Sequence, residues 1–115
     1  MASGWISKKI RANIYARDSY ICCYCGIQTL PYSSEMQKSN ALLIATLDHI
    51  VSRHEIAKQC DNDAGYSAAI KNPENLVCVC NGCNSSKKHT DLEVWCETKG
   101  YDYTMICREI ARRVS

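Results

Sequence analysis

The N-terminal part of the chain has the hydrophobic pattern of an amphipathic helix. Ile6, Ile10 and Ile14 stand four residues apart, and lysine and arginine occupy positions between them. Apolar residues at this spacing share one face of an α-helix, so we expect a helix over residues 5–17. The apolar face of such a helix needs a core elsewhere in the chain to cover it.

Two short apolar runs in the middle of the chain predict strands. Residues 41–47 form an apolar run with β-branched members, which is typical of a buried strand. Residues 75–79 predict a second strand, antiparallel to the first. Residues 51–74 lack strong periodicity and predict a long loop with one short helix at 64–71, and a loop of this length usually has a function. The polar, turn-rich residues 31–40 predict a surface loop.

The C-terminal third predicts helices. A turn and a helix are expected from residue 80 onward, and Leu92 and Trp95 continue a helical face up to Gly100, which is placed to end it. Residues 103–114 carry the pattern of a last amphipathic helix. With the two strands, these elements predict an α+β fold, and a length of 115 residues predicts one domain over residues 1–115.

Four of the nine cysteines are spaced as metal ligands. Cys22 and Cys25 form one Cys-x-x-Cys pair, and Cys80 and Cys83 form the second. A two-residue gap lets one tight turn direct both thiolates at a single ion, so the pairs predict one tetrahedral Cys₄ zinc site that stabilises the fold. An odd number of cysteines fits metal binding in a reducing compartment better than disulfides.

Composition and charge narrow the classes of protein only a little. The hydrophobic fraction is 46%, no apolar run approaches the roughly 20 residues of a membrane span, and no signal peptide is evident, so we expect a cytoplasmic protein. A net charge of +2 decides nothing about partners. Basic clusters can follow a phosphate backbone, although solvated helix faces look the same in sequence. Three such clusters are Lys8, Lys9, Arg11 and Arg17; Lys87, Lys88 and His89; and Arg108, Arg112 and Arg113.

Between the two cysteine pairs stand Asp48 and His49, a carboxylate next to an imidazole. Asp48 offers a carboxylate oxygen, and Asn84, which follows the second pair, offers an amide oxygen; both suit Mg²⁺ or Mn²⁺. Adjacent strand residues face opposite ways, so His49 is free to take a proton from water if the strand is twisted or ends there. With Lys87 or Arg53 near a phosphate, this arrangement would hydrolyse a phosphodiester with one metal ion.

Four separated blocks of the chain resemble the zinc-containing HNH endonucleases, in the small single-domain form found in phages and bacteria. The blocks are Arg-Asp-Ser-Tyr-Ile-Cys-x-x-Cys-Gly at 17–26, Leu-Asp-His-Ile at 47–50, Asn-Leu-Val at 75–77 and Cys-x-x-Cys-Asn-x-x-Lys at 80–87. They occur in the order found in that family, within about residues 11–88. The segment 54–72 departs from the pattern because it has no Gly-Gly marker.

The resemblance implies a ββα-metal (His-Me finger) core with flanking helices. It implies that His49 is the general base, that Asp48 and Asn84 hold the catalytic Mg²⁺ or Mn²⁺, and that Asn75 ties down the loop at the catalytic strand. The position of Lys87, three residues after Asn84, favours the side of the active site. The implied activity is nicking or cleavage of double-stranded DNA with 5′-phosphate products, by a monomer or weak homodimer.

Other interpretations of the same residues stay open. His49 could be a packed, hydrogen-bonded strand histidine, and Lys87 could be an ordinary helix-surface lysine. A zinc-stapled nucleic-acid-binding module without cleavage activity would explain the cysteines, although it would have no need for Asp48, His49 and Asn84 together. A nuclease directed at RNA or at a particular nucleic-acid structure would share the chemistry. Target sequence and strand preference are not encoded in any pattern that we can interpret.

Overall fold

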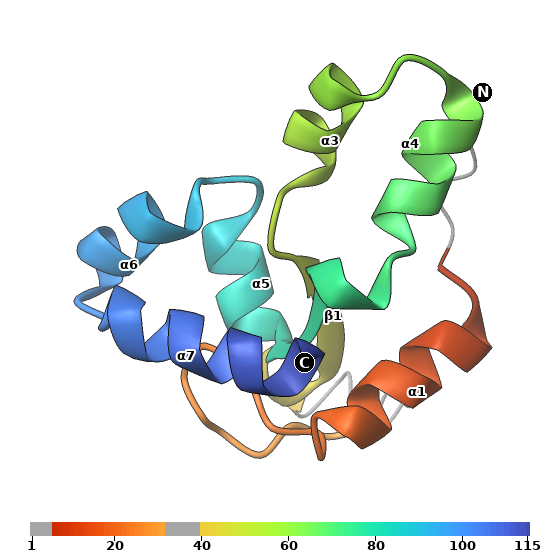
Figure 1. Ribbon diagram of the computed structural model, residues 1–115. Helices are drawn as coiled ribbons and strands as arrows, with labels where there is room; N and C mark the ends of the chain where they lie inside the picture. The colour runs from red at the N-terminus through yellow and green to blue at the C-terminus, as the bar shows by residue number, and fades with distance from the viewer. Residues whose placement is uncertain (1–5, 32–39) are drawn as a thin grey trace.

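The computed structural model describes residues 6–31 and 40–115 (Figure 1). Positions 32–39 of the predicted surface loop lie outside the described residues. The structure confirms a mixed fold of helices with a two-stranded antiparallel sheet. With η for 3₁₀ turns, the elements are α1 (Lys8–Arg17), η1 (Ala41–Leu43), β1 (Ala45–His49), α3 (Arg53–Gln59), α4 (Asp63–Ile70), η2 (Pro73–Asn75), β2 (Leu76–Cys80), α5 (Asn81–Lys87), α6 (Leu92–Lys99) and α7 (Tyr103–Val114).

The two strands pair antiparallel as predicted, but β1 lies further along the chain than the prediction of residues 41–47. It pairs with β2 so that Asp48 stands opposite Val77 and His49 opposite Leu76. The first residues of the predicted strand form η1 instead, where Leu42 is 66% exposed. A continuous apolar run does not show where pairing begins, because the partner strand sets the limits of a strand.

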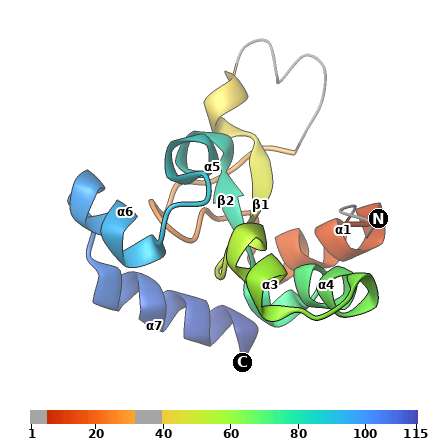
Figure 2. The ribbon, with the colours of Figure 1, turned by 90° about the horizontal axis from the view of Figure 1, so that it is seen from above.

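The two faces of the sheet are covered by different helices. Side chains alternate along a strand, so Leu47 and His49 share one face, while Thr46 and Asp48 share the other. Leu47 packs with Ile14 of α1, and the second face looks toward α5. Figure 2 shows α1 and α5 on opposite sides of the strands. Neighbouring residues of β1 therefore lie in different environments.

Residues 51–74 contain two helices where the sequence predicted a loop with one. Helix α4 corresponds to the predicted helix at 64–71, whereas α3 was not predicted. The Ser52 hydroxyl accepts a hydrogen bond from the Glu55 N–H at 3.2 Å and caps the start of α3. A serine followed three residues later by glutamate is the signature of a capping box, so a local signal for this helix was present.

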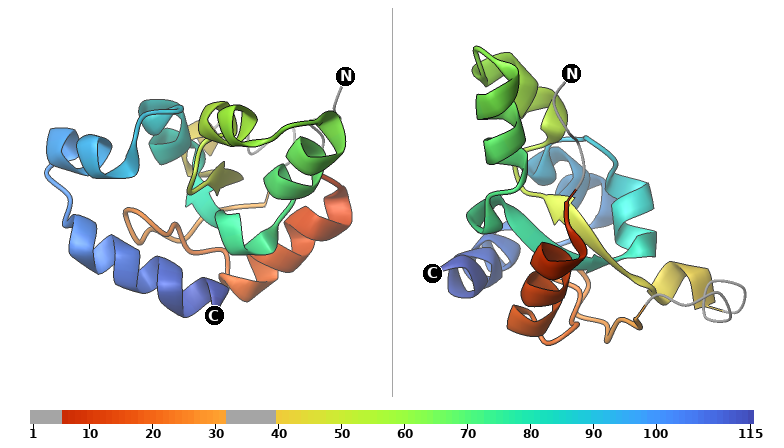
Figure 3. Two further views of the ribbon diagram at one scale, coloured as in Figure 1. Left: turned by 45° about the horizontal axis from the view of Figure 1, so that its top comes forward. Right: turned by 90° about the vertical axis from the view of Figure 1, so that its right-hand side faces the viewer.

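The C-terminal helices agree with the prediction, and α7 is fastened to the rest of the fold by a buried arginine. Gly100 ends α6 in the left-handed conformation with φ 76°. Arg113 is 6% exposed; it contacts Glu109 at 2.6 Å and Asp18 at 3.4 Å, and donates to the Ile21 carbonyl at 2.7 Å. Figure 3 shows the end of α7 beside the end of α1. Within the described ranges, no helix combines the length and apolar character needed to cross a membrane.

Candidate active site

The four predicted metal-ligating cysteines meet at one point. Their sulfurs all lie within 4.8 Å of one another, and the Cys25 and Cys80 sulfurs are 3.8 Å apart. Tetrahedral zinc with Zn–S bonds of about 2.3 Å separates its sulfurs by about 3.8 Å. Cys22 and Cys25 come from the turn after α1, while Cys80 and Cys83 come from the end of β2 and from α5. The cluster could therefore hold one zinc ion that joins these segments.

The peptide groups around the cluster favour thiolates. The Cys25 N–H points at the Cys22 sulfur at 3.5 Å, and the Cys83 N–H points at the Cys80 sulfur at 3.4 Å. The pKa of Cys22 is lowered to about 4, mainly by the hydrogen bond from the Cys83 thiol and to a lesser degree by the hydrogen bond from the peptide N–H of Cys25. The hydrogen bond to Cys22 raises the pKa of Cys83, and zinc would displace the remaining thiol protons on binding.

Asp48 lies on the α5 face of the sheet with one carboxylate oxygen engaged. Its Oδ2 accepts a hydrogen bond from the Tyr24 hydroxyl at 2.5 Å and contacts the Lys87 ammonium at 2.9 Å. Burial, and then the charge of Asp48, raise the pKa of Tyr24 well above its ordinary value of 10.0, so this hydroxyl stays protonated and donates. Oδ1 of Asp48 is thereby left for another partner.

Lys87 lies on the side of the active site, with its ammonium group against Asp48. The sequence also allowed a place beside a substrate phosphate or on the helix surface, but the side chain is fully buried, with an exposure of 0%. The contact is an ion pair without hydrogen-bond geometry. A fully buried lysine is rare without a paired charge, and here the charge is the carboxylate itself. Lys87 thus neutralises the charge of Asp48 from within the fold.

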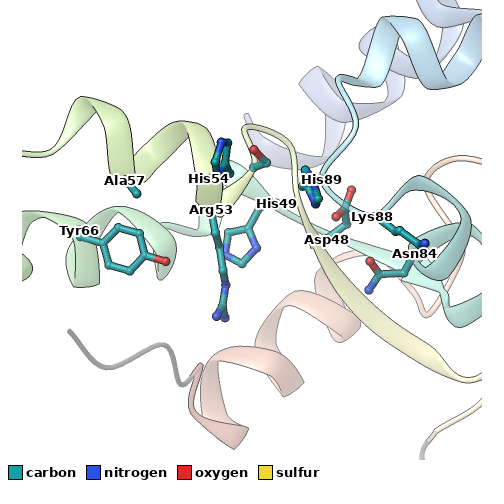
Figure 4. Close-up of a pocket in the computed structure, with 10 residues that line it drawn as sticks. Asp48, His49, Arg53, His54, Ala57, Tyr66, Asn84, Lys88 and His89 are labelled. Carbon is teal, nitrogen blue, oxygen red and sulfur yellow. The ribbon is translucent and has the colours of Figure 1, made fainter. Parts of the chain in front are cut away.

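Asn84 lies next to Asp48 with its amide group fixed in one orientation. Its Nδ2 donates to the Thr46 hydroxyl at 3.0 Å and to the Leu47 carbonyl at 3.2 Å. Both amide hydrogens are used in this way, so the carbonyl oxygen is the atom that Asn84 can offer to a ligand. Figure 4 shows Asn84 and Asp48 on the same side of β1. Two oxygen donors, from a strand and a helix, are therefore close together.

His49 lies across β1 from Asp48 (Figure 4). Its Nε2 is 2.8 Å from the Ile70 carbonyl oxygen at the end of α4. A carbonyl only accepts, so Nε2 carries the proton of the neutral ring, and Nδ1 keeps a lone pair. Burial lowers the pKa of His49 below its ordinary value of 6.5, although the bond to Ile70 opposes this shift. The imidazole is therefore neutral at pH 7.

Asn75 closes the turn that leaves β1. Its side-chain oxygen accepts from the Val51 N–H at 2.8 Å, and its amide nitrogen donates to the Val51 carbonyl at 3.0 Å. The Asn75 carbonyl also accepts from the Ile50 N–H at 3.0 Å. These bonds fix the backbone directly after His49.

Asp48, His49 and Asn84 line a common cleft of about 500 Å³ at the end of β1. All three histidines of the chain reach this cleft, and α3 supplies a wall that the sequence did not predict. Sequence reasoning also missed the contribution of Tyr66. The lining residues are Asp48, His49, Ser52, Arg53, His54, Ala57, Tyr66, Asn84, Lys88 and His89 (Figure 4).

Replacing Lys87 with methionine is expected to destabilise the fold by about 3–5 kcal/mol near neutral pH, since it leaves Asp48 buried without its counter-charge. Urea denaturation near neutral pH measures the loss. Lys88→Met is the matched control, because Lys88 is exposed and should change stability by no more than about 0.5 kcal/mol. Equal effects of the two substitutions would contradict the role of Lys87.

Comparison with known proteins adds little to this geometry. No family model matches the chain, and no curated protein matches it. Among solved structures, it is similar to the Type II-C Cas9 enzyme from Actinomyces naeslundii, with a TM-score of 0.49 and 21% sequence identity. The match covers 97% of this chain and 12% of that one, so the chain spans a small part of the length of that enzyme. A similarity of this level does not identify an activity, which has to be inferred from the site.

Proposed function

We propose that the chain is a metal-dependent DNA endonuclease of the HNH type, built as one domain around a ββα-metal core of β1, β2 and α5. One observation carries the proposal. Asp48 and Asn84 each offer one oxygen donor, because their other polar atoms are engaged. His49 offers a neutral imidazole with a free lone pair, and all three residues line the same cleft. A metal-assisted hydrolase needs these parts within reach of one substrate atom.

The donor set fits a hard divalent cation. Carboxylate and amide oxygens are ligands that Mg²⁺ and Mn²⁺ prefer, and two protein ligands leave positions for water and a phosphate oxygen. When bound, such a cation would stabilise the charge that develops on the phosphate and on the leaving oxygen. Asp48 supplies Oδ1 because Tyr24 and Lys87 engage Oδ2, and Asn84 supplies its carbonyl oxygen.

His49 is placed to act as the general base. Its Nε2–H is held by the Ile70 carbonyl, which fixes the tautomer and leaves Nδ1 to accept a proton from water. The lowered pKa keeps the ring neutral at pH 7, so the base is ready without prior loss of a proton. Asn75 holds the adjoining turn and so limits movement of His49.

The charges around the cleft favour a phosphodiester backbone as the substrate. Arg53 and Lys88 line the cleft, and Asp48, which Lys87 neutralises, is the single acid among the described lining residues. A cleft with this balance attracts a polyanion. We assign double-stranded DNA as the substrate and 5′-phosphate ends as the products from the resemblance to HNH endonucleases, and the four cysteines to a structural zinc ion.

The function is tested by incubating the protein with supercoiled plasmid DNA in Mg²⁺, Mn²⁺ or EDTA, after metal analysis shows about one zinc per chain. We expect open-circular or linear DNA with Mg²⁺ or Mn²⁺ and none with EDTA. Binding to DNA without nicking under any of these metals would rule out the nuclease and favour a zinc-stapled nucleic-acid-binding module.

A further inference from the structure

One buried contact joins the cysteine cluster to the proposed catalytic ligand. Tyr24 lies within the turn formed by Cys22 and Cys25, and its hydroxyl donates to Asp48 Oδ2 at 2.5 Å. Tyr24 and Asp48 are each only 6% exposed. The same residue therefore belongs to the loop that would hold zinc and to the hydrogen bonds of the carboxylate in the cleft.

The cysteine turn and the core around it determine where the Tyr24 hydroxyl lies. The Cys23 N–H donates to the Cys78 carbonyl of β2 at 2.9 Å, which fastens the backbone next to Tyr24. The Tyr24 ring packs on Trp95 with centroids 5.3 Å apart, and the Trp95 indole N–H donates to the Ser86 hydroxyl of α5 at 3.1 Å. A tyrosine held on both sides has little freedom to redirect its hydroxyl.

Lys87 cannot replace this contact. Its ammonium lies 2.9 Å from the same Oδ2, but without hydrogen-bond geometry, and a point charge on a flexible stem does not fix the rotation of a carboxylate. The directional bond from Tyr24 supplies that restraint. Without it, Asp48 could present either oxygen to Lys87, and Oδ1 would no longer be reserved for the cleft.

We propose that Tyr24 is a positioning residue that couples the two metal sites. Zinc at the four cysteines fixes the turn that carries Tyr24, and Tyr24 holds Asp48 so that Oδ1 is offered to the divalent cation. Hydrogen-bond partners of a metal ligand commonly change affinity 10–100-fold when they are removed. This inference rests on the proposed function, because it assumes that Asp48 binds the catalytic cation.

The test is Mn²⁺ binding without DNA, measured by calorimetry and electron paramagnetic resonance on zinc-loaded protein. Tyr24→Phe keeps the ring on Trp95 and removes only the hydroxyl. We expect it to retain one zinc per chain and to bind Mn²⁺ about 10-fold or more weakly than the wild type. Tyr20→Phe is the matched control, because Tyr20 precedes the same turn and packs on Tyr15, and its Mn²⁺ affinity should not change.

A second variant separates the hydroxyl from the packing of the ring. Placing 4-aminophenylalanine at position 24 restores a hydrogen-bond donor on the same ring, and we expect it to recover most of the Mn²⁺ affinity. Wild-type affinity in Tyr24→Phe, or no recovery with the amino analogue, would overturn the coupling. If Asp48→Asn binds Mn²⁺ as tightly as the wild type, the cation site itself is wrong and the proposed function fails as well.

Discussion

Replacing His49 with alanine is expected to slow metal-dependent nicking by about 10²–10⁴-fold, the contribution that a positioned general base makes to a hydrolysis. The substitution removes Nδ1, whose lone pair is free because Nε2–H is bound to the Ile70 carbonyl. It leaves Asp48 and Asn84 in place, so zinc content and Mn²⁺ affinity should stay close to wild-type values. Initial rates on supercoiled plasmid, at saturating Mn²⁺, measure the loss.

His54→Ala is the matched control for this substitution. His54 lines the same cleft but is exposed, and we expect it to affect DNA affinity more than the rate at saturating DNA. The wild type should also lose activity as the pH falls through a value below 6.5, because protonation of His49 removes the base. If His49→Ala retains the wild-type rate in a folded, zinc-loaded protein, His49 is not the base.

Removing zinc is expected to abolish the cooperative fold. Structural zinc contributes about 10–16 kcal/mol in small domains, whereas the net stability of a domain is about 5–15 kcal/mol. The ligand Cys22 and its neighbours Cys23 and Tyr24 pack in the main hydrophobic cluster with Cys80 and Cys83. Loss of the ion would remove the bonds that join the turn after α1 to the end of β2 and to α5.

Thermal unfolding followed by circular dichroism, with and without a zinc chelator, measures this effect. Cys80→Ser should behave like the chelated protein, because it removes one ligand at the junction of β2 and α5. Cys60→Ser is the control, since Cys60 ends α3 outside the cluster and is partly exposed. A zinc-free protein with the melting temperature of the zinc-loaded form would show that the ion does not stabilise the fold.

Local signals in the sequence predicted the parts of the structure that depend on nearby residues. The spacing within each cysteine pair predicted a metal-binding turn, and Gly100 predicted the end of α6, because each depends on a few consecutive residues. The convergence of the two pairs followed from the four ligands that one zinc ion needs. Helix α3 was missed although Ser52 and Glu55 carry a capping signal, since its seven residues are too few for a clear hydrophobic period. The start of β1 depended on pairing with β2, which no local pattern reports.

The contacts that organise the site are less accessible to sequence reasoning. Tyr24 is 24 positions from Asp48, and nothing near it indicates which hydroxyl will meet which carboxylate. Lys87 was expected on the side of the active site because it follows Asn84 by three residues, while its full burial depends on the paired charge of Asp48. Residue types and spacing suggest the chemistry, while the orientation of each group follows from long-range packing.

The paired hydrogen bonds between Asn75 and Val51 make residues 52–74, which connect the two strands, a segment that could be exchanged as a unit. Residues 52–74 leave the sheet after Val51 and rejoin it at Asn75, so the hydrogen bonds between these two residues close the segment at its base. Apart from the Ile70 carbonyl that orients His49, its contribution to the cleft is wall residues such as Arg53 and Tyr66. In the nuclease that we propose, substrate preference could therefore diverge through this segment, by insertion or exchange, while β1 and α5 stay unchanged.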